Sequence, residues 1–90
     1  MAQTAQVTMF GLSTCPYCRR AKEFMDQNGV KYDLTYVDLL EGEEKDTVVR
    51  EVAELNPRLS FPTIVIGSGD KAEIYVGLDS TCEQALLAVL

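Results

Sequence analysis

The sequence contains no histidine and no tryptophan among its 90 residues. Without histidine, the chain has no Ser-His or Cys-His catalytic pair, no histidine general base and no histidine ligand for a metal ion. Basic side chains are also scarce, because eight lysines and arginines face 14 aspartates and glutamates, for a net charge of −6. Phosphate groups and anionic membranes bind basic surfaces, so we expect neither nucleic acid nor a membrane as a partner.

Long apolar runs are absent as well. No stretch of the chain approaches the roughly 20 apolar residues that span a bilayer, and residues 1–10 lack the charged and apolar regions of a secretory signal. We therefore expect a cytoplasmic, monomeric protein. A chain of this length forms one domain, which we place at residues 7–90, after a flexible extension of residues 1–6.

Hydrophobic and turn-forming residues alternate along the chain in a pattern that predicts seven elements. We expect strands at 7–12, 30–38, 63–66 and 71–76, and helices at 16–28, 43–54 and from 80 to the C-terminus. The order β-α-β-α-β-β-α begins with a right-handed parallel βαβ unit and continues with a hairpin and a helix. It predicts an α/β fold of the thioredoxin-like type, a four-stranded mixed sheet flanked by helices.

Several residues mark the ends of these helices. Pro16 suits the first position of a helix, and Gly29 suits the position just after its end. Pro57 ends the second helix, the hairpin turns at residues 67–70, and the capping box Ser80-x-x-Glu83 opens the last helix. The expected apolar face of the first helix consists of Tyr17, Ala21, Phe24 and Met25. That of the second consists of Val48, Val49, Val52, Ala53 and Leu55.

Two of the three cysteines form the motif Cys15-Pro16-Tyr17-Cys18 at the start of the first helix. A Cys-x-x-Cys motif that follows a strand and opens a helix is typical of a dithiol oxidoreductase. The unpaired N–H groups and the positive dipole at the helix N-terminus stabilise the Cys15 thiolate. We expect Pro16, Arg19 and Arg20 to contribute to the same effect.

The spacing predicts a redox cycle for Cys15 and Cys18. Cys15 attacks a substrate disulfide, and Cys18, one helical turn away, resolves the mixed disulfide to leave an internal disulfide that a reductant must reopen. A zinc site within one chain is disfavoured because it needs four ligands, so we assign no metal ligand. An iron–sulfur or other metal carrier that uses the same thiolates in a dimer remains an alternative.

Three further residues allow more than one interpretation. The Tyr17 ring is expected at the rim of the active site, and the alternative is a half-exposed helix residue without a role. Phe61 either belongs to an exposed apolar docking patch or packs under the second helix. Cys82 is expected to be buried as a small apolar residue, and the alternative is a second reactive thiol. From local sequence alone, we expect the Phe61–Pro62 bond to be trans.

The chain from Val7 to Leu90 resembles glutaredoxin. The matching segments are Val7-Thr8-Met9-Phe10, Thr14-Cys15-Pro16-Tyr17-Cys18-Arg19-Arg20-Ala21-Lys22, Arg58-Leu59-Ser60-Phe61-Pro62 and Val76-Gly77-Leu78-Asp79-Ser80. The resemblance implies a glutaredoxin-like thiol–disulfide oxidoreductase without a tightly bound cofactor. Its substrates would be protein or glutathione mixed disulfides, and glutathione would be its reductant.

The resemblance also implies roles for particular residues. It makes Pro62 a cis proline that faces the active site, preceded by Phe61, whose backbone binds the cysteinyl part of the substrate. Gly77, Asp79 and Ser80 would bind the γ-glutamyl end of glutathione at a helix N-terminus. Tyr17 and Arg58 would add further glutathione contacts.

Three positions depart from the family pattern. Leu12 stands where a lysine is common, Ser60-Phe61-Pro62 replaces Thr-Val-Pro, and Val76 replaces the first glycine of a glycine pair. The turn Val76-Gly77-Leu78 is similar to that of glutaredoxin-like electron donors reduced by thioredoxin reductase. The reductant therefore stays open between glutathione and thioredoxin reductase.

Overall fold

The computed structural model describes residues 3–58, 60–67 and 72–90. Its elements are β1 (Val7–Gly11), α1 (Pro16–Gln27), β2 (Asp33–Tyr36), the 3-10 helix η1 (Val37–Leu39), α2 (Gly42–Leu55), β3 (Thr63–Ile66), β4 (Glu73–Val76) and α3 (Ser80–Ala88). The expected order β-α-β-α-β-β-α is confirmed. Most of the expected hairpin turn, residues 68–70, and Lys71 lie outside the described residues.

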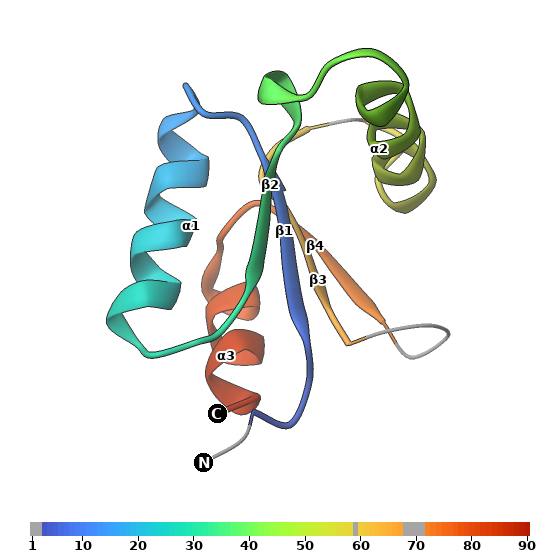
Figure 1. Cartoon of the computed structure of the whole chain (residues 1–90). Coiled ribbons are helices and arrows are strands. Elements are labelled where there is room, and N and C mark those ends of the chain that lie inside the picture. The colour runs from blue at the N-terminus through green and yellow to red at the C-terminus, as the bar shows by residue number, and fades with distance from the viewer. Residues whose placement is uncertain (1–2, 59, 68–71) are drawn as a thin grey trace.

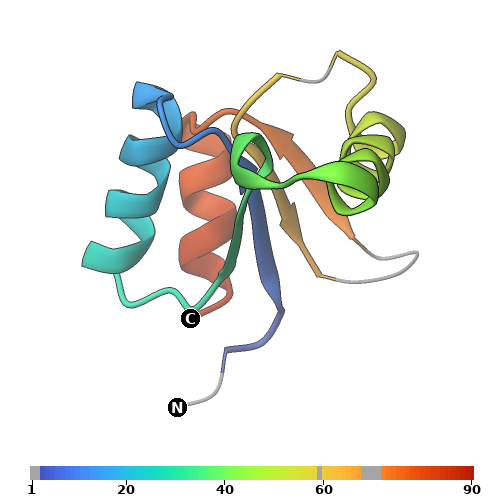
Figure 2. The ribbon, with the colours of Figure 1, turned by 45° about the horizontal axis from the view of Figure 1, so that its top comes forward.

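The four strands form one mixed sheet in the order β2-β1-β3-β4. β1 pairs in parallel with β2, and the pairs β1–β3 and β3–β4 are antiparallel. Figures 1 and 2 show α1 and α3 on one face of the sheet and α2 on the other. This arrangement confirms the thioredoxin-like plan, a four-stranded mixed sheet flanked by helices.

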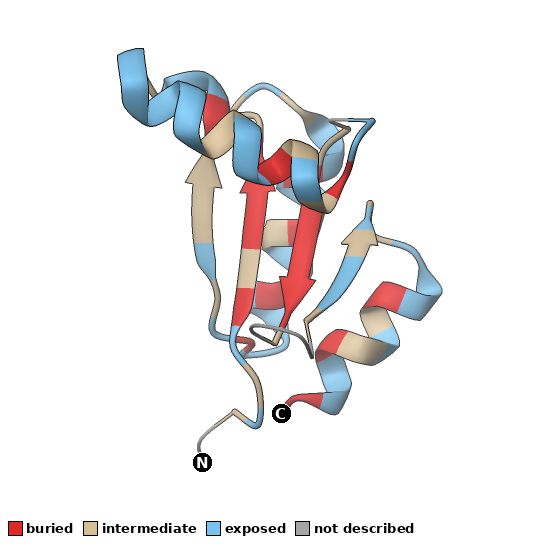
Figure 3. Ribbon diagram, turned by 90° about the vertical axis from the view of Figure 1, so that its right-hand side faces the viewer, coloured by how far each residue is buried: buried red, intermediate tan, exposed pale blue. Residues whose placement is uncertain are grey.

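Side chains alternate between two hydrophobic cores because successive residues of a strand point to opposite faces. Met9 and Ile64 are fully buried beneath α1 and α3. Phe10 and Val65 point the other way and pack with Val52 of α2. The two central strands, β1 and β3, are accordingly the most buried part of the sheet (Figure 3). No helix in the described parts of the chain is long and apolar enough to cross a membrane.

The second strand is shorter than its sequence pattern predicts. Instead of residues 30–38, β2 spans Asp33–Tyr36. Val30 is already buried at the end of α1, where its N–H donates to the Met25 carbonyl at 2.9 Å. After β2 the chain turns into η1, which buries Val37 against the α2 side of the sheet. The alternating apolar pattern continues on both sides of β2, in residues 30–32 and 37–38. The backbone of these residues does not pair with β1.

The ends and faces of two helices also differ from expectation. Asp79, not Ser80, caps α3, because its carboxylate accepts a hydrogen bond from the Cys82 N–H at 2.9 Å. The helix ends at Ala88 rather than at the C-terminus. On α1, Cys18 takes the buried position that we expected of Tyr17, whose side chain is 65% exposed.

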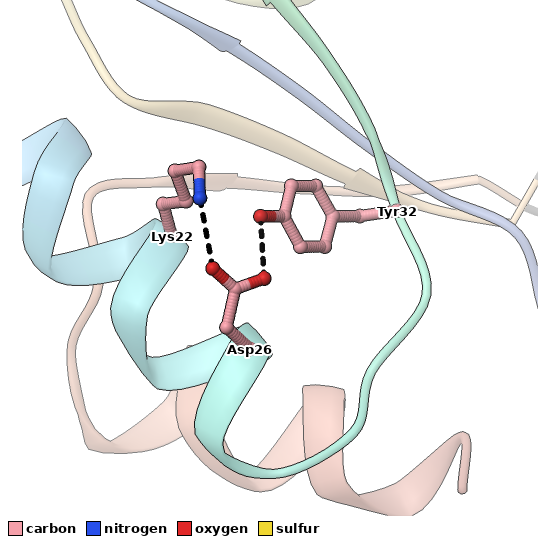
Figure 4. A network of polar contacts seen from close by, with 3 residues as sticks. All are labelled: Lys22, Asp26 and Tyr32. Carbon is pink, nitrogen blue, oxygen red and sulfur yellow. Dashed lines mark hydrogen bonds and ion pairs between the residues drawn. The ribbon is translucent and has the colours of Figure 1, made fainter.

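A polar network joins the last turns of α1 to the segment before β2 (Figure 4). Asp26 accepts from the Lys22 ammonium at 2.8 Å and from the Tyr32 hydroxyl at 2.7 Å. These groups lie at the surface, where such pairs contribute little stability. Near the N-terminus, the Thr4 N–H donates to the Val89 carbonyl at 2.8 Å. The flexibility of residues 1–6 stays a prediction.

Asn56 is a buried polar residue at the end of α2. Its amide Nδ2 donates to the Ser60 carbonyl and hydroxyl, both at 3.1 Å, and to the Thr63 hydroxyl at 3.3 Å. Its Oδ1 accepts from the Arg58 N–H at 3.3 Å. One side chain therefore fixes the path of the chain from α2 into β3.

We expect Asn56→Ala to lower the free energy of unfolding by about 1–3 kcal/mol, because buried partners lose their hydrogen bonds. Asn28→Ala is the matched control. Its amide makes one exposed bond to the Phe24 carbonyl, so we expect a loss of roughly 0.5 kcal/mol or less. Urea denaturation measures both variants, and equal losses would contradict this role of Asn56.

Candidate active site

Cys15 lies at the junction between β1 and α1. It is the N-cap residue of α1, with an extended backbone (φ −85°, ψ 119°), and Pro16 follows as the first helical residue. The Cys15 N–H donates to the Leu12 carbonyl at 3.1 Å, and the Cys15 carbonyl accepts from the Arg19 N–H at 3.2 Å. The thiol is thereby held over the unpaired N–H groups of the first helical turn.

The surroundings of Cys15 favour its thiolate. Burial alone would raise the pKa of Cys15, but the neighbouring N–H groups of Cys18 and Tyr17 and the Cys18 thiol favour its thiolate and together lower the pKa below its ordinary value of 9.0. The Cys15 side chain is half-buried, so a substrate can reach it. Arg19 and Arg20 are exposed. Their expected contribution to stabilising the Cys15 thiolate stays a prediction.

Cys18 occupies the opposite environment. Its side chain is 1% exposed, and its sulfur accepts the Leu12 N–H at 3.4 Å. Burial, together with the neighbouring Cys15 and Asp38, raises the pKa of Cys18 to about 11. A Cβ atom added to Gly11 would lie 3.1 Å from the Cys18 sulfur. The glycine at the end of β1 therefore gives the second thiol its space.

Asp38 anchors the loop before Cys15, and the sequence analysis missed this role. Its carboxylate accepts from the Ser13 N–H at 2.9 Å and from the Ser13 hydroxyl. Both bonds lower the pKa of Asp38 below its usual value of 3.8, and the bond from the Ser13 hydroxyl has the larger effect. The partners are 25 residues apart, so no short motif reveals them. The available signal is topological, because the carboxyl ends of parallel strands meet at one edge of a sheet.

A groove of about 490 Å³ is lined by Tyr17 of the Cys-x-x-Cys motif, although neither thiol is among its lining residues. Its lining residues come from α1, from the segment before β3, and from the end of β4 through the start of α3. They are Tyr17, Arg20, Phe61, Pro62, Val76, Gly77, Leu78, Asp79 and Glu83. A groove of this size matches the range of small-molecule sites. Leu78 and Glu83 were not among the expected site residues.

The structure brings together most, but not all, of the residues that the sequence analysis assigned to substrate binding. Arg58 and Ser80 are not among the described residues that line the groove. The Phe61–Pro62 bond is cis, as the family resemblance implies, so the expectation of a trans bond from local sequence is wrong. The Gly77 N–H donates to the Pro62 carbonyl at 2.8 Å and closes the groove on one side.

The structure places Phe61 and Cys82, for each of which the sequence left two alternatives open. Phe61 is half-buried and packs against both hydrophobic cores while also lining the groove. Cys82 is fully buried in α3, as expected of a small apolar residue, and burial raises its pKa to about 11. Within the described ranges, no group of three or more cysteine or carboxylate side chains is placed to hold a metal ion.

The matching family model and a curated relative are both glutaredoxins. The glutaredoxin family model matches residues 7–70. Human Glutaredoxin-1 is 32% identical over 66 residues, which are 72% of this chain and 62% of the human protein. The match thus spans less than two thirds of that relative.

Two solved archaeal structures are similar over more of their length. The glutaredoxin of Archaeoglobus fulgidus has 36% sequence identity and a TM-score of 0.78, over 92% of this chain and 86% of that one. The methanoredoxin of Methanosarcina acetivorans also has 36% identity, with a TM-score of 0.82 over 92% and 85% of the two chains. The chain belongs to the glutaredoxin family.

Proposed function

We propose that the protein is a thiol–disulfide oxidoreductase that reduces protein and glutathione mixed disulfides. The observation that supports this most directly is the opposite placement of its two neighbouring thiols. Cys15 is reachable and its pKa is lowered, whereas Cys18 is buried and its pKa is raised. A thiolate is the attacking species in disulfide exchange, so Cys15 is the nucleophile and Cys18 the resolving thiol.

The cycle transfers two electrons from the dithiol to the substrate. The Cys15 thiolate attacks one substrate sulfur, a new S–S bond forms to Cys15, and the substrate S–S bond breaks to release the first thiolate. Cys18 then loses its proton and attacks the Cys15 sulfur. The second substrate thiolate leaves, and a Cys15–Cys18 disulfide remains.

We propose glutathione as the reductant that reopens this disulfide. Two glutathione molecules supply the two electrons and leave as oxidised glutathione. Glutathione has one ammonium group and two carboxylates. In the groove, the Asp79 and Glu83 carboxylates suit the ammonium, and the Arg20 guanidinium suits a carboxylate. Tyr17, Phe61, Pro62 and Gly77 would line the peptide between these ends.

Further assignments of residues, location and assembly stay proposals. Arg58 and Ser80 would approach glutathione only after binding, since they lie outside the groove. Pro16 and the two arginines that follow Cys18 would tune the thiolate. We also propose that the protein works as a cytoplasmic monomer without a bound cofactor.

Reduction of the oxidised protein by two systems tests the proposed function. We expect turnover with glutathione, glutathione reductase and NADPH, and a loss of about 100-fold or more in Cys15→Ser, which lacks the nucleophile. Cys18→Ser should instead accumulate a mixed disulfide. The readout is NADPH oxidation, with thioredoxin reductase and NADPH run in parallel.

The other outcomes of this assay point to different functions. Turnover with thioredoxin reductase alone would identify a thioredoxin-like electron donor and contradict the choice of glutathione. Activity with neither system would contradict the oxidoreductase proposal. It would favour an iron–sulfur or metal carrier, which colour in anaerobically purified protein would reveal.

The contact between Gly11 and Cys18 gives a second prediction. In Gly11→Ala, the added methyl group would press on the Cys18 sulfur, which must give by a few tenths of an ångström, so we expect slower closure of the Cys15–Cys18 disulfide. Stability should also fall by about 1–3 kcal/mol, as overpacking typically costs. The reduced protein is mixed rapidly with a disulfide substrate, and the remaining free thiols are alkylated after set times. The loss of free thiols with time gives the rate at which the Cys15–Cys18 disulfide forms.

Gly29→Ala is the matched control for this variant. Gly29 has a φ of +72° and open space around its Cβ position, so alanine there costs about 1 kcal/mol through the backbone alone. We expect its closure rate to match that of the wild type. A Gly11→Ala variant that closes its disulfide as fast as Gly29→Ala would refute the spacing role of Gly11.

A further inference from the structure

The outer edge of β4 presents free backbone groups. β4 is the last strand of the sheet, and β3 is its strand neighbour among the described residues. The Gly77 N–H donates to the Pro62 carbonyl, which fixes residue 77 as one that bonds to β3. Since bonded residues alternate in an antiparallel ladder, Glu73 and Tyr75 also bond to β3, whereas Ile74 and Val76 point their N–H and C=O groups outward.

The pairing of β3 with β1 supports this register independently. The Gly67 N–H donates to the Gln6 carbonyl at 2.7 Å, and the register pairs Thr8 with Val65. By the same alternation, Val65 bonds to β1, so its partner across the other edge, Ile74, is in a non-bonded pair. Both ladders therefore leave the backbone N–H and C=O of Ile74 unbonded to β3 and pointing outward from the sheet edge.

The side chains at this edge are apolar and exposed. Ile74 is 40% exposed and Val76 is 51% exposed. They lie on the α2 face of the sheet, because they pair with Val65 and Thr63, but α2 does not cover them. Figure 3 shows β4 as the exposed margin of a sheet whose central strands are buried. In the described part of the chain, this edge has no proline, bulge or covering segment, and such an edge is a template for another strand.

This edge continues into the active-site groove. Val76 belongs to both, since it is an outward residue of β4 and lines the groove together with Phe61 and Pro62. A strand laid along β4 therefore leads toward Cys15 at one end. The carboxylates of Asp79 and Glu83 line the groove at the end of this path, with Arg20 as the groove's cation.

We infer that β4 binds an extended, basic segment of a disulfide-bearing protein substrate as a fifth strand. The segment hydrogen-bonds to the outward groups of Ile74 and Val76, covers their side chains, and delivers its cysteine to Cys15 through the groove. Charge decides against a second copy of this chain as the occupant, because the chain has a net charge of −6. The inference rests on the proposed function.

Trapping a peptide on Cys18→Ser tests the inference directly. The probe is a short synthetic peptide with lysines beside one cysteine, joined by a disulfide to thionitrobenzoate. The Cys15 thiolate attacks the peptide sulfur, the Cys15–peptide S–S bond forms, and the aromatic thiolate leaves with the electron pair, which its colour reports. Amide hydrogen exchange by NMR then follows the strand residues.

We expect the trapped peptide to slow exchange at the Ile74 and Val76 amides by about tenfold or more, as a new backbone hydrogen bond does. The Glu73 and Tyr75 amides, already bonded to β3, should change little. No release of colour would overturn the proposed function itself. Release of colour with unchanged exchange at Ile74 and Val76 would overturn the inference and leave the function standing.

Substitutions at Ile74 provide a kinetic test in the wild-type dithiol. Ile74→Pro removes an outward N–H that bonds to nothing in β3, so the sheet is preserved. We expect its KM for the lysine peptide disulfide to rise by about five- to tenfold, and Ile74→Lys should raise it by repelling the peptide. Activity on a small uncharged disulfide should stay unchanged, and Ile74→Val is the matched control.

Three results would overturn the inference here. One is a KM for the lysine peptide that is the same in Ile74→Lys as in Ile74→Val. Another is an equal preference of the wild type for lysine and glutamate peptides at low salt. The third is sedimentation that shows a wild-type dimer dissociated by Ile74→Pro, which would assign the edge to a second copy of the chain.

Discussion

The N-terminus of α1 is the constraint on which the rest of the structure depends. Its unpaired N–H groups face the Cys15 sulfur and lower the pKa of that thiol. The same turn places Cys18 one step along the helix, where burial raises its pKa. Two chemically identical groups three residues apart thus acquire opposite properties. The surrounding elements maintain this difference: Gly11 leaves room for the buried sulfur, and Asp38 fixes the loop through Ser13.

Chemistry and substrate binding meet at one end of the sheet. The carboxyl end of β1 leads to the dithiol, and the segment around Pro62 begins β3 beside it. β4 then ends at Val76, and the N–H of the next residue, Gly77, donates to the Pro62 carbonyl. The groove therefore has one wall from α1, through Tyr17 and Arg20, and a binding wall from the hairpin and α3. Because β4 is also the sheet edge, the binding wall continues outward into backbone groups that can accept a further strand.

Local sequence patterns predict the two cysteines and the helix that carries them. They do not predict the contacts that hold this segment in place. The Cys15–Cys18 spacing, Pro16 at the helix start and the bounds of β3 follow from neighbouring residues, and the structure confirms them. The contacts of Asp38 with Ser13 and of Gly11 with Cys18 depend on how separate elements pack, so no local pattern contains them. The second strand ends early for the same reason, since the chain turns into η1 and buries Val37 in the core on the α2 side of the sheet. The cap of α3 differs because Asp79 and Ser80 both suit an N-cap, and their order along the chain does not decide between them.

The most direct measurement of the central claim is the pH dependence of alkylation at each thiol of the reduced wild-type protein. Iodoacetamide labelling followed by peptide mapping reports Cys15 and Cys18 separately. The account predicts that Cys15 is labelled first, with a midpoint below pH 9.0. Cys18 should stay protected until the pH approaches its pKa of about 11. Labelling of both thiols at equal rates with one midpoint, or of Cys18 first, would contradict the account.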